Sequence, residues 1–106
     1  MATDATFVAF ILDQLSGLPG VSARKMFGEY ALYSETKVVA LICENQLFVK
    51  PTDAGRKHLG TPIEAPPYPT AKPCFLIQDA LDDREGLRKL ISVTAQALPM
   101  PKAKKR

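Results

Sequence analysis

The chain has 106 residues, of which 46% are hydrophobic and 24% charged, which suits one globular domain with a single core. Its longest apolar run, residues 38–43, is too short to span a membrane, and its N-terminus lacks the basic region of a signal peptide, so we expect a cytoplasmic protein. The net charge of +3 comes from the C-terminal end, because the residues before it carry ten basic against eleven acidic side chains, without the excess of a nucleic-acid-binding surface.

The N-terminal half is predicted to form a helix followed by a β-meander. Apolar side chains recur at helical spacing over residues 4–17, and Gly17 ends the pattern. The four predicted strands cover residues 21–27, 30–34, 38–43 and 46–50. The short turns between them permit only antiparallel neighbours, and Gly28 is expected to set the first turn. Lys25 falls on the apolar face of its strand. Either a β-bulge turns its side chain to the other face, or the aliphatic part of the side chain lies along apolar surface, and we favour the bulge.

The C-terminal half adds a short helix, a proline-rich loop, a fifth strand and a last helix. They cover, in this order, residues 53–60, 62–73, 74–78 and 82–98. Asp53 is the expected N-cap of the short helix. Because proline fixes φ and lacks a backbone donor, the loop is predicted to be extended and to contain no strand. Residues 99–106 are predicted to be a basic, disordered tail.

The order of elements, α-β-β-β-β-α-β-α, predicts an α+β fold. We expect a two-layer sandwich in which helices cover one face of a roughly five-stranded antiparallel sheet. Strict alternation assigns to the helix-covered face Val39, Leu41, Leu47 and Val49. It assigns to the opposite face Val38, Ile42, Phe48 and either Phe75 or Ile77. That face is too apolar for open water, so we expect a loop or a second subunit to cover it, and a homodimer is one hypothesis.

The sequence contains no motif with a catalytic mechanism, such as a nucleophile elbow, a metalloprotease pair of histidines or a phosphate-binding loop. His58 is interpreted as an exposed helix residue, and the acids at residues 82–85 as a favourable helix start. Cys43 and Cys74 are interpreted as buried thiols that act as small apolar side chains. We therefore expect no enzyme, no cofactor and no metal site.

Candidate binding residues, in contrast, are present. Arg24 and Lys25 in the first hairpin and Tyr68 in the proline-rich loop can border a pocket for a small ligand or nucleic acid, and Tyr30 can stack on a base. Weak, salt-sensitive binding of nucleic acid is expected from the cations of the tail, which are Lys102, Lys104, Lys105 and Arg106.

One string, RKMFGEYALY at residues 24–33, is followed by VALICENQLFVKPTD and APPYPTAKP, and this combination resembles the N-terminal domain of the TfoX/Sxy family. The matching positions are Arg24, Met26, Phe27, Gly28, Tyr30, Leu47, Lys50, Pro67 and Tyr68. Glu29 stands where the family has a second glycine. The resemblance covers roughly residues 7–98, so residues 1–98 are the predicted domain.

The resemblance implies a secretion-chaperone-like α+β architecture and a regulatory role in competence and DNA transformation, alongside a transcription factor such as the cyclic-AMP receptor protein. The two-domain regulators add a C-terminal helical domain, and this sequence ends before one could begin, so we expect a stand-alone N-terminal domain. The first hypothesis is therefore a non-enzymatic protein-interaction module. The second is a small-ligand or nucleic-acid binder whose candidate residues are Arg24, Lys25, Tyr30, Lys50 and Tyr68.

Overall fold

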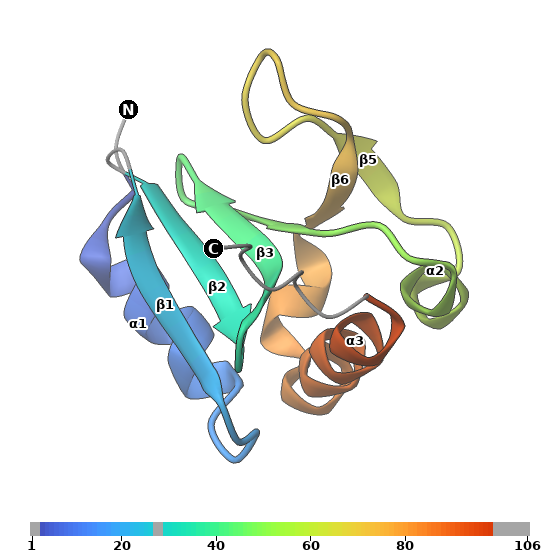
Figure 1. Ribbon diagram of the computed structural model, residues 1–106, viewed down its shortest axis with the longest axis horizontal. Helices are drawn as coiled ribbons and strands as arrows, with labels where there is room; N and C mark the ends of the chain where they lie inside the picture. The colour runs from blue at the N-terminus through green and yellow to red at the C-terminus, as the bar shows by residue number, and fades with distance from the viewer. Residues whose placement is uncertain (1–2, 27–28, 99–106) are drawn as a thin grey trace, which may run out of the picture.

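The computed structural model describes residues 3–26 and 29–98 (Figure 1). The predicted turn at Gly28 and the four tail cations lie outside the described residues. The elements in chain order are α1 (Ala5–Gln14), β1 (Val21–Met26), β2 (Glu29–Ser34), β3 (Lys37–Cys43), β4 (Gln46–Val49), α2 (Asp53–Leu59), β5 (Ile63–Ala65), β6 (Cys74–Ile77), a short 3-10 helix (Asp79–Asp82) and α3 (Arg84–Ala97).

The strands form a six-stranded antiparallel sheet in the order β1-β2-β3-β4-β6-β5, which confirms the predicted α+β class. The sixth strand is a correction, because β5 lies in the proline-rich segment that was expected to contain no strand. It pairs Ile63 with Leu76 of β6, while Pro62 and Pro66 flank it on either side. An edge strand pairs on one side only, so prolines that stand just outside it remove no ladder hydrogen bond.

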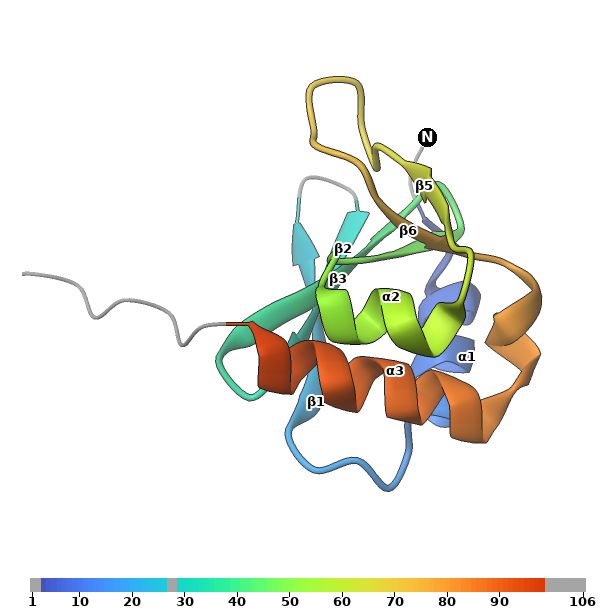
Figure 2. The same ribbon diagram turned by 90° about the vertical axis from the view of Figure 1, so that its right-hand side faces the viewer.

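The helices pack on one face of the sheet, which we call the helix face. Its centre consists of fully buried side chains from three adjacent strands, namely Ile42, Leu47, Val49 and Phe75. Figure 1 shows α1 behind β1 and β2, and Figure 2 shows α2 alongside α3. The other face, which we call the open face, carries a second and smaller apolar cluster built on Cys43, Phe48 and Cys74, with Leu41, Ala65 and Leu76 packed against it.

A β-bulge explains why strict alternation misassigned part of β3. Leu32 of β2 pairs with Ala40, whereas Tyr33 pairs with Val38, so Val39 is an extra residue in β3. After the bulge, the residues of β3 face the side of the sheet opposite to the one that counting in twos from Val39 predicts. Ile42 therefore joins the helix-face core and Leu41 lies on the open face, opposite to the expectation.

Three smaller expectations are corrected as well. Phe75 and Ile77, which were both candidates for the open face, belong to the helix-face core. The bulge favoured at Lys25 is wrong, since β1 pairs with β2 in one unbroken register from Val21 to Met26 and the side chain of Lys25 is exposed. The N-cap of α2 is Thr52, one residue before the predicted Asp53.

Candidate functional site

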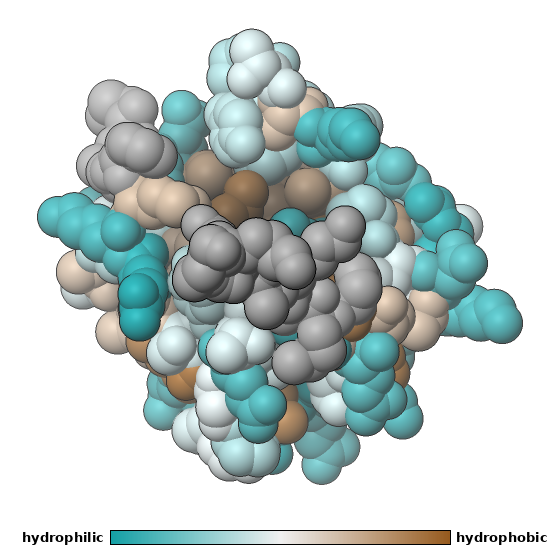
Figure 3. Space-filling model, in the orientation of Figure 1, coloured by the Kyte–Doolittle hydropathy of each residue, from teal (hydrophilic) through white to brown (hydrophobic). Residues whose placement is uncertain are grey.

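An apolar groove of about 830 Å³ lies on the open face of the sheet. Figure 3 shows it as a hollow with brown side chains beneath the loop between β5 and β6. Its floor is formed by strands β3 and β4, one wall by the proline-rich loop, and the other wall by the ends of β1 and β2. The residues that line it are Met26, Glu29, Tyr30, Leu41, Cys43, Glu44, Gln46, Phe48, Pro66, Pro67, Tyr68 and Pro69.

The floor follows from the strand register. Leu41 of β3 pairs with Phe48 of β4, and Phe48 pairs in turn with Leu76 of β6, so three apolar side chains form a row across the open face. Directly paired residues in antiparallel strands place their side chains on the same face, which makes the row continuous. Phe48 is almost fully buried, whereas Leu41 is only half-buried. Leu41 is therefore the floor residue that an occupant of the groove would contact most directly.

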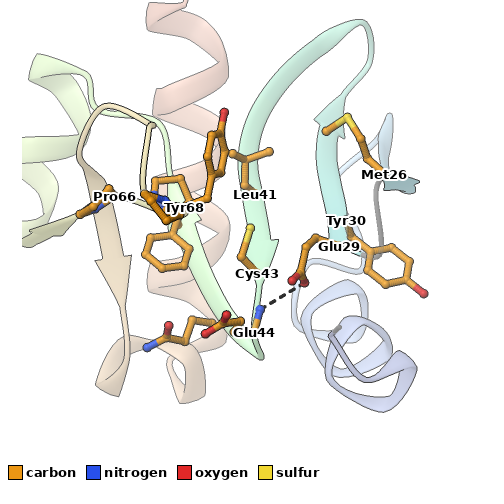
Figure 4. Close-up of a pocket in the computed structure, with 12 residues that line it drawn as sticks. Met26, Glu29, Tyr30, Leu41, Cys43, Glu44, Pro66 and Tyr68 are labelled. Atoms are coloured by element: carbon orange, nitrogen blue, oxygen red, sulfur yellow. Dashed lines mark hydrogen bonds between the residues drawn. The ribbon is translucent and has the colours of Figure 1, made fainter. Parts of the chain in front are cut away.

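The proline-rich loop forms the wall opposite β2. The backbone nitrogen of Ala71 donates a hydrogen bond of 2.9 Å to the carbonyl oxygen of Tyr68, which closes a tight turn with Pro69 at its second position. Proline at this position favours the turn because its φ is already restricted. The side chain of Tyr68 remains 52% exposed and extends from the loop toward Leu41 (Figure 4). The loop therefore covers part of the open face, for which a covering loop or second subunit was expected.

Two carboxylates give the groove an acidic end. The backbone nitrogen of Glu44 donates a hydrogen bond of 3.2 Å to Oε1 of Glu29, drawn as the dashed line in Figure 4. The same oxygen accepts a hydrogen bond of 2.5 Å from the buried hydroxyl of Thr3. Glu44 and Asn45 both have positive φ, which is the geometry of a two-residue turn between antiparallel strands. These contacts fix the side chain of Glu29 at the end of the floor.

The charge of these carboxylates reaches the floor of the groove. Burial raises the pKa of the Cys43 thiol, and the charges of Glu29 and Glu44 raise it further. Burial also raises the pKa of Cys74, although the nearby charge of Lys50 acts in the opposite direction. Both thiols are free and buried, which agrees with their interpretation as small apolar side chains. Because their pKa values are raised from 9.0, both stay protonated at neutral pH.

The two predicted tyrosines both line the groove but contribute differently. Tyr68 extends over the floor, whereas the ring of Tyr30 points away from Leu41 and packs partly against the helix-face core (Figure 4). Lys50 follows β4 and donates a backbone hydrogen bond of 2.9 Å to the carbonyl oxygen of Val39, so its position is set by the sheet. Lys50 lies outside the set of groove-lining residues.

The predicted cations of the first hairpin also lie outside the groove. Arg24 is exposed on β1, and its guanidinium carbon lies 5.7 Å from the ring centre of Tyr33 on the neighbouring strand. Lys25 is exposed and occupies the register position opposite Tyr30. The charged groups that line the groove are therefore acidic, which the sequence pattern did not indicate. Glu29 was visible there only as the replacement of a family glycine.

Sites for metal or acid–base chemistry are sparse in the described part of the chain. No group of three or more His, Cys, Asp and Glu side chains within residues 3–26 and 29–98 is placed to hold a metal ion. His58 is exposed on α2, as predicted, and its Nε2 atom lies 3.0 Å from the carbonyl oxygen of Gly86. Among the helices of the same residues, none has the length and apolar character needed to cross a membrane.

The sheet, the covering helices and the groove define a small α+β domain with an apolar groove on one face of its sheet. The chain matches the TfoX N-terminal domain family over residues 13–98 and belongs to that family, as the hairpin string predicted. It is also similar to an uncharacterized 12.7 kDa protein in the trpE 5′ region of Spirochaeta aurantia. The two sequences are 45% identical over 105 residues, which cover 99% of this chain and 91% of that protein.

Proposed function

We propose that this TfoX N-terminal domain is a non-enzymatic protein-interaction module that acts in the regulation of competence and DNA transformation. The groove on the open face supports this proposal, since its volume of about 830 Å³ lies within the range of preformed binding sites. Its floor offers apolar contact through Leu41 and Phe48, and the carboxylates of Glu29 and Glu44 favour a cationic residue. The partner of this groove is a protein segment that combines apolar side chains with Lys or Arg.

The test uses a matched pair of substitutions in the full chain. Leu41→Lys places a charge on the floor of the groove, and Phe10→Lys makes the same kind of change at a 38% exposed position on α1. The cyclic-AMP receptor protein is the first partner to titrate, by calorimetry, followed by other transcription factors. We expect Leu41→Lys to abolish binding and Phe10→Lys to leave it unchanged. Equal binding by both variants would exclude the groove as the contact surface.

A small-ligand role is a second candidate, favoured by the size of the groove and by the tyrosines at its walls, Tyr30 and Tyr68. Among the cations in the original hypothesis, Arg24 and Lys25 take no part in lining the groove. A bound ligand would raise the melting temperature because it binds only the native state. The measurement is a thermal-shift panel of metabolites and oligonucleotides. If no compound raises the melting temperature of the full chain, this candidate is excluded.

Nucleic-acid binding through the tail remains a proposal that is independent of the groove. Replacing all four tail cations, Lys102, Lys104, Lys105 and Arg106, with Gln removes the charge excess of the chain. We expect DNA binding by the full chain, measured by fluorescence anisotropy, to weaken steeply with salt and to disappear in this variant. If the variant still binds DNA, the binding site lies on the folded domain, and Arg24→Ala with Lys25→Ala is the next pair to test.

A further inference from the structure

We propose that the groove recognises an extended segment of a partner protein in which an apolar residue and a Lys or Arg stand two positions apart, and that Glu29 determines this specificity. The inference rests on the proposed function, because it names the sequence pattern that the same groove selects. Three features of the described residues support it: the apolar surface around Leu41, the spacing between Leu41 and Glu29, and the fixed carboxylate of Glu29.

The open face carries most of the exposed apolar side chains. In the part of the chain that the structure describes, four large hydrophobic side chains are exposed, and three of them, Met26, Ile63 and Tyr68, lie on this face. Met26 and Tyr68 line the groove from opposite sides, with the half-buried Leu41 between them (Figure 4). Apolar side chains that gather at a hollow are typical of a contact surface. Leu41 is therefore the position that receives the apolar residue of the segment.

The strand register sets the distance between Leu41 and the acidic end of the groove. Leu41 of β3 pairs with Ala31 of β2, and Glu29 stands two residues before Ala31, so its side chain leaves the same face of the sheet. Leu41 and Glu29 are thus diagonal neighbours, roughly 7–8 Å apart. Side chains on one face of an extended peptide repeat about every 7 Å, whereas neighbouring side chains on a helix are only about 5–6 Å apart. An extended segment that contacts Leu41 therefore carries its cation two positions away, in either chain direction.

The carboxylate of Glu29 is held through one oxygen atom, which leaves the other for a ligand. Its Oε1 atom accepts a hydrogen bond of 2.5 Å from the hydroxyl of Thr3 and one of 3.2 Å from the backbone nitrogen of Glu44. Thr3 is buried, and its hydroxyl oxygen accepts a hydrogen bond of 3.3 Å from the backbone nitrogen of Asn45 in the β3–β4 turn. Among the described residues, none donates a hydrogen bond to Oε2 of Glu29. An incoming cation therefore meets a carboxylate that loses little conformational freedom on binding.

The surroundings of Glu29 suit a cation on a long aliphatic stem. Met26 pairs with Glu29 across the first hairpin and is 40% exposed, so the stem of a lysine or arginine can lie along its flexible thioether while the charged end reaches the carboxylate. Glu44 adds a second negative charge at this end of the groove, and the charges of both carboxylates raise the pKa of Cys43 on the floor. The same charges repel a phosphate backbone. The groove therefore favours a basic peptide over nucleic acid.

The test titrates the full chain with synthetic peptides and follows its amide signals by nuclear magnetic resonance. The probe peptide has Leu-Ser-Lys at its centre and Gly and Ser elsewhere, and a reference peptide carries norleucine in place of the lysine, which keeps the aliphatic stem without the charge. We expect the signals of Leu41 and Glu29 to shift, and the lysine peptide to bind roughly three- to tenfold more tightly than the reference. Peptides with Leu-Lys or Leu-Ser-Ser-Lys at the centre should lose most of this preference.

Matched substitutions identify the residue that gives the preference. Glu29→Gln removes the charge and keeps an oxygen that can accept the same hydrogen bonds, so it should bind the lysine and norleucine peptides equally well. Thr3→Val removes the hydroxyl that positions Glu29. It should lower the ratio of the two affinities and leave the affinity for the norleucine peptide unchanged, whereas a general disturbance of the fold would weaken both. The control is Glu35→Gln in the exposed turn between β2 and β3, which should keep the wild-type ratio.

Three results would overturn the inference. The first is equal binding of the lysine and norleucine peptides by the wild type, and the second is an unchanged preference in Glu29→Gln. The third is the absence of any shift at Leu41 and Glu29 with all of the peptides. If one of these occurs while Leu41→Lys still abolishes partner binding, only this inference fails. If Leu41→Lys also leaves partner binding intact, the proposed function fails with it.

Discussion

The two faces of the sheet differ in what covers them, although the same strands build both. On the helix face, Ile42 of β3 is fully buried under the helices. On the open face, the adjacent Leu41 is only half-buried, because a single proline-rich loop covers the groove in part. These neighbouring residues of one strand therefore differ in burial: Ile42 contributes to the core, whereas Leu41 is available for the proposed contact with a partner. Substitutions can separate these two roles.

The largest expected effect on the free energy of unfolding comes from truncating Ile42 or its neighbour Leu41. Ile42→Ala should lower the free energy of unfolding by about 2–5 kcal/mol, because it leaves a cavity in a fully buried site. Leu41→Ala should cost clearly less, since its side chain already borders solvent in the native state, yet it should weaken partner binding. Urea denaturation of both variants measures the difference. Equal losses of stability would show that the open face is as much a part of the core as the helix face.

A smaller effect on the free energy of unfolding is expected at the start of α3, which lies on the helix face. Oδ1 of Asp83 accepts a hydrogen bond of 3.0 Å from the backbone nitrogen of Gly86 and caps the helix. Asp83→Ala should lower the free energy of unfolding by about 1 kcal/mol and leave binding in the groove unchanged. Asp82→Ala is the control, since it removes an exposed carboxylate at the neighbouring position. A comparable loss in both variants would argue for a general charge effect instead of a cap.

The elements of the helix face could be predicted closely from local sequence patterns. The helical spacing of apolar residues predicted α1 and α3. The first ends at Gln14, before the expected stop at Gly17, and the second ends at Ala97, next to the expected end at residue 98. The β-meander of β1 to β4 was predicted from the alternation of apolar and polar residues and from the short turns between the strands. The pairing partners of these strands needed no long-range information, because each strand of the meander pairs with its neighbour in sequence.

The groove could be predicted only in part, because it depends on long-range contacts. The apolar character of the open face and a role for Tyr68 were visible in the sequence, but the bulge at Val39 was not, and it decides that Leu41 faces the groove. The strand β5 forms only because β6 offers it an edge, which no local pattern encodes. The acidic end was missed for a similar reason, since Glu29 and Glu44 are 15 residues apart and meet through the sheet.

A modest gain in stability is predicted on the helix face. Thr94 of α3 is fully buried, and within the described residues its hydroxyl oxygen has no hydrogen-bond partner. Thr94→Val removes this buried polar atom and keeps a similar shape, so it should raise the free energy of unfolding by about 1 kcal/mol. Thr94→Ser, which keeps the hydroxyl and loses a methyl group, should be destabilised in the same urea titration. A loss of stability in Thr94→Val would mean that the hydroxyl contributes to the native state.

The smallest effect on stability is expected from a rise in pH, which deprotonates the two thiols of the open face. The native pKa values of Cys43 and Cys74 are raised above the ordinary thiol value of 9.0, mainly by burial. The native state therefore keeps these protons to higher pH than the unfolded chain does. The resulting stability is fully present below the unfolded value and is lost as pH rises through the native values. Urea midpoints should accordingly be constant near about pH 8 and fall toward about pH 10.

The two thiols differ in their neighbours, which sharpens this prediction. The charges of Glu29 and Glu44 raise the pKa of Cys43, whereas the charge of Lys50 lowers that of Cys74. Glu44→Gln should therefore bring the native pKa of Cys43 closer to its unfolded value and make the alkaline loss of stability shallower, while Glu64→Gln on β5 serves as the charge-matched control. If Glu44→Gln leaves the pH dependence unchanged, the charge of Glu44 does not act on Cys43. The proposed preference of the groove for cationic segments then loses the part of its electrostatic support that comes from Glu44.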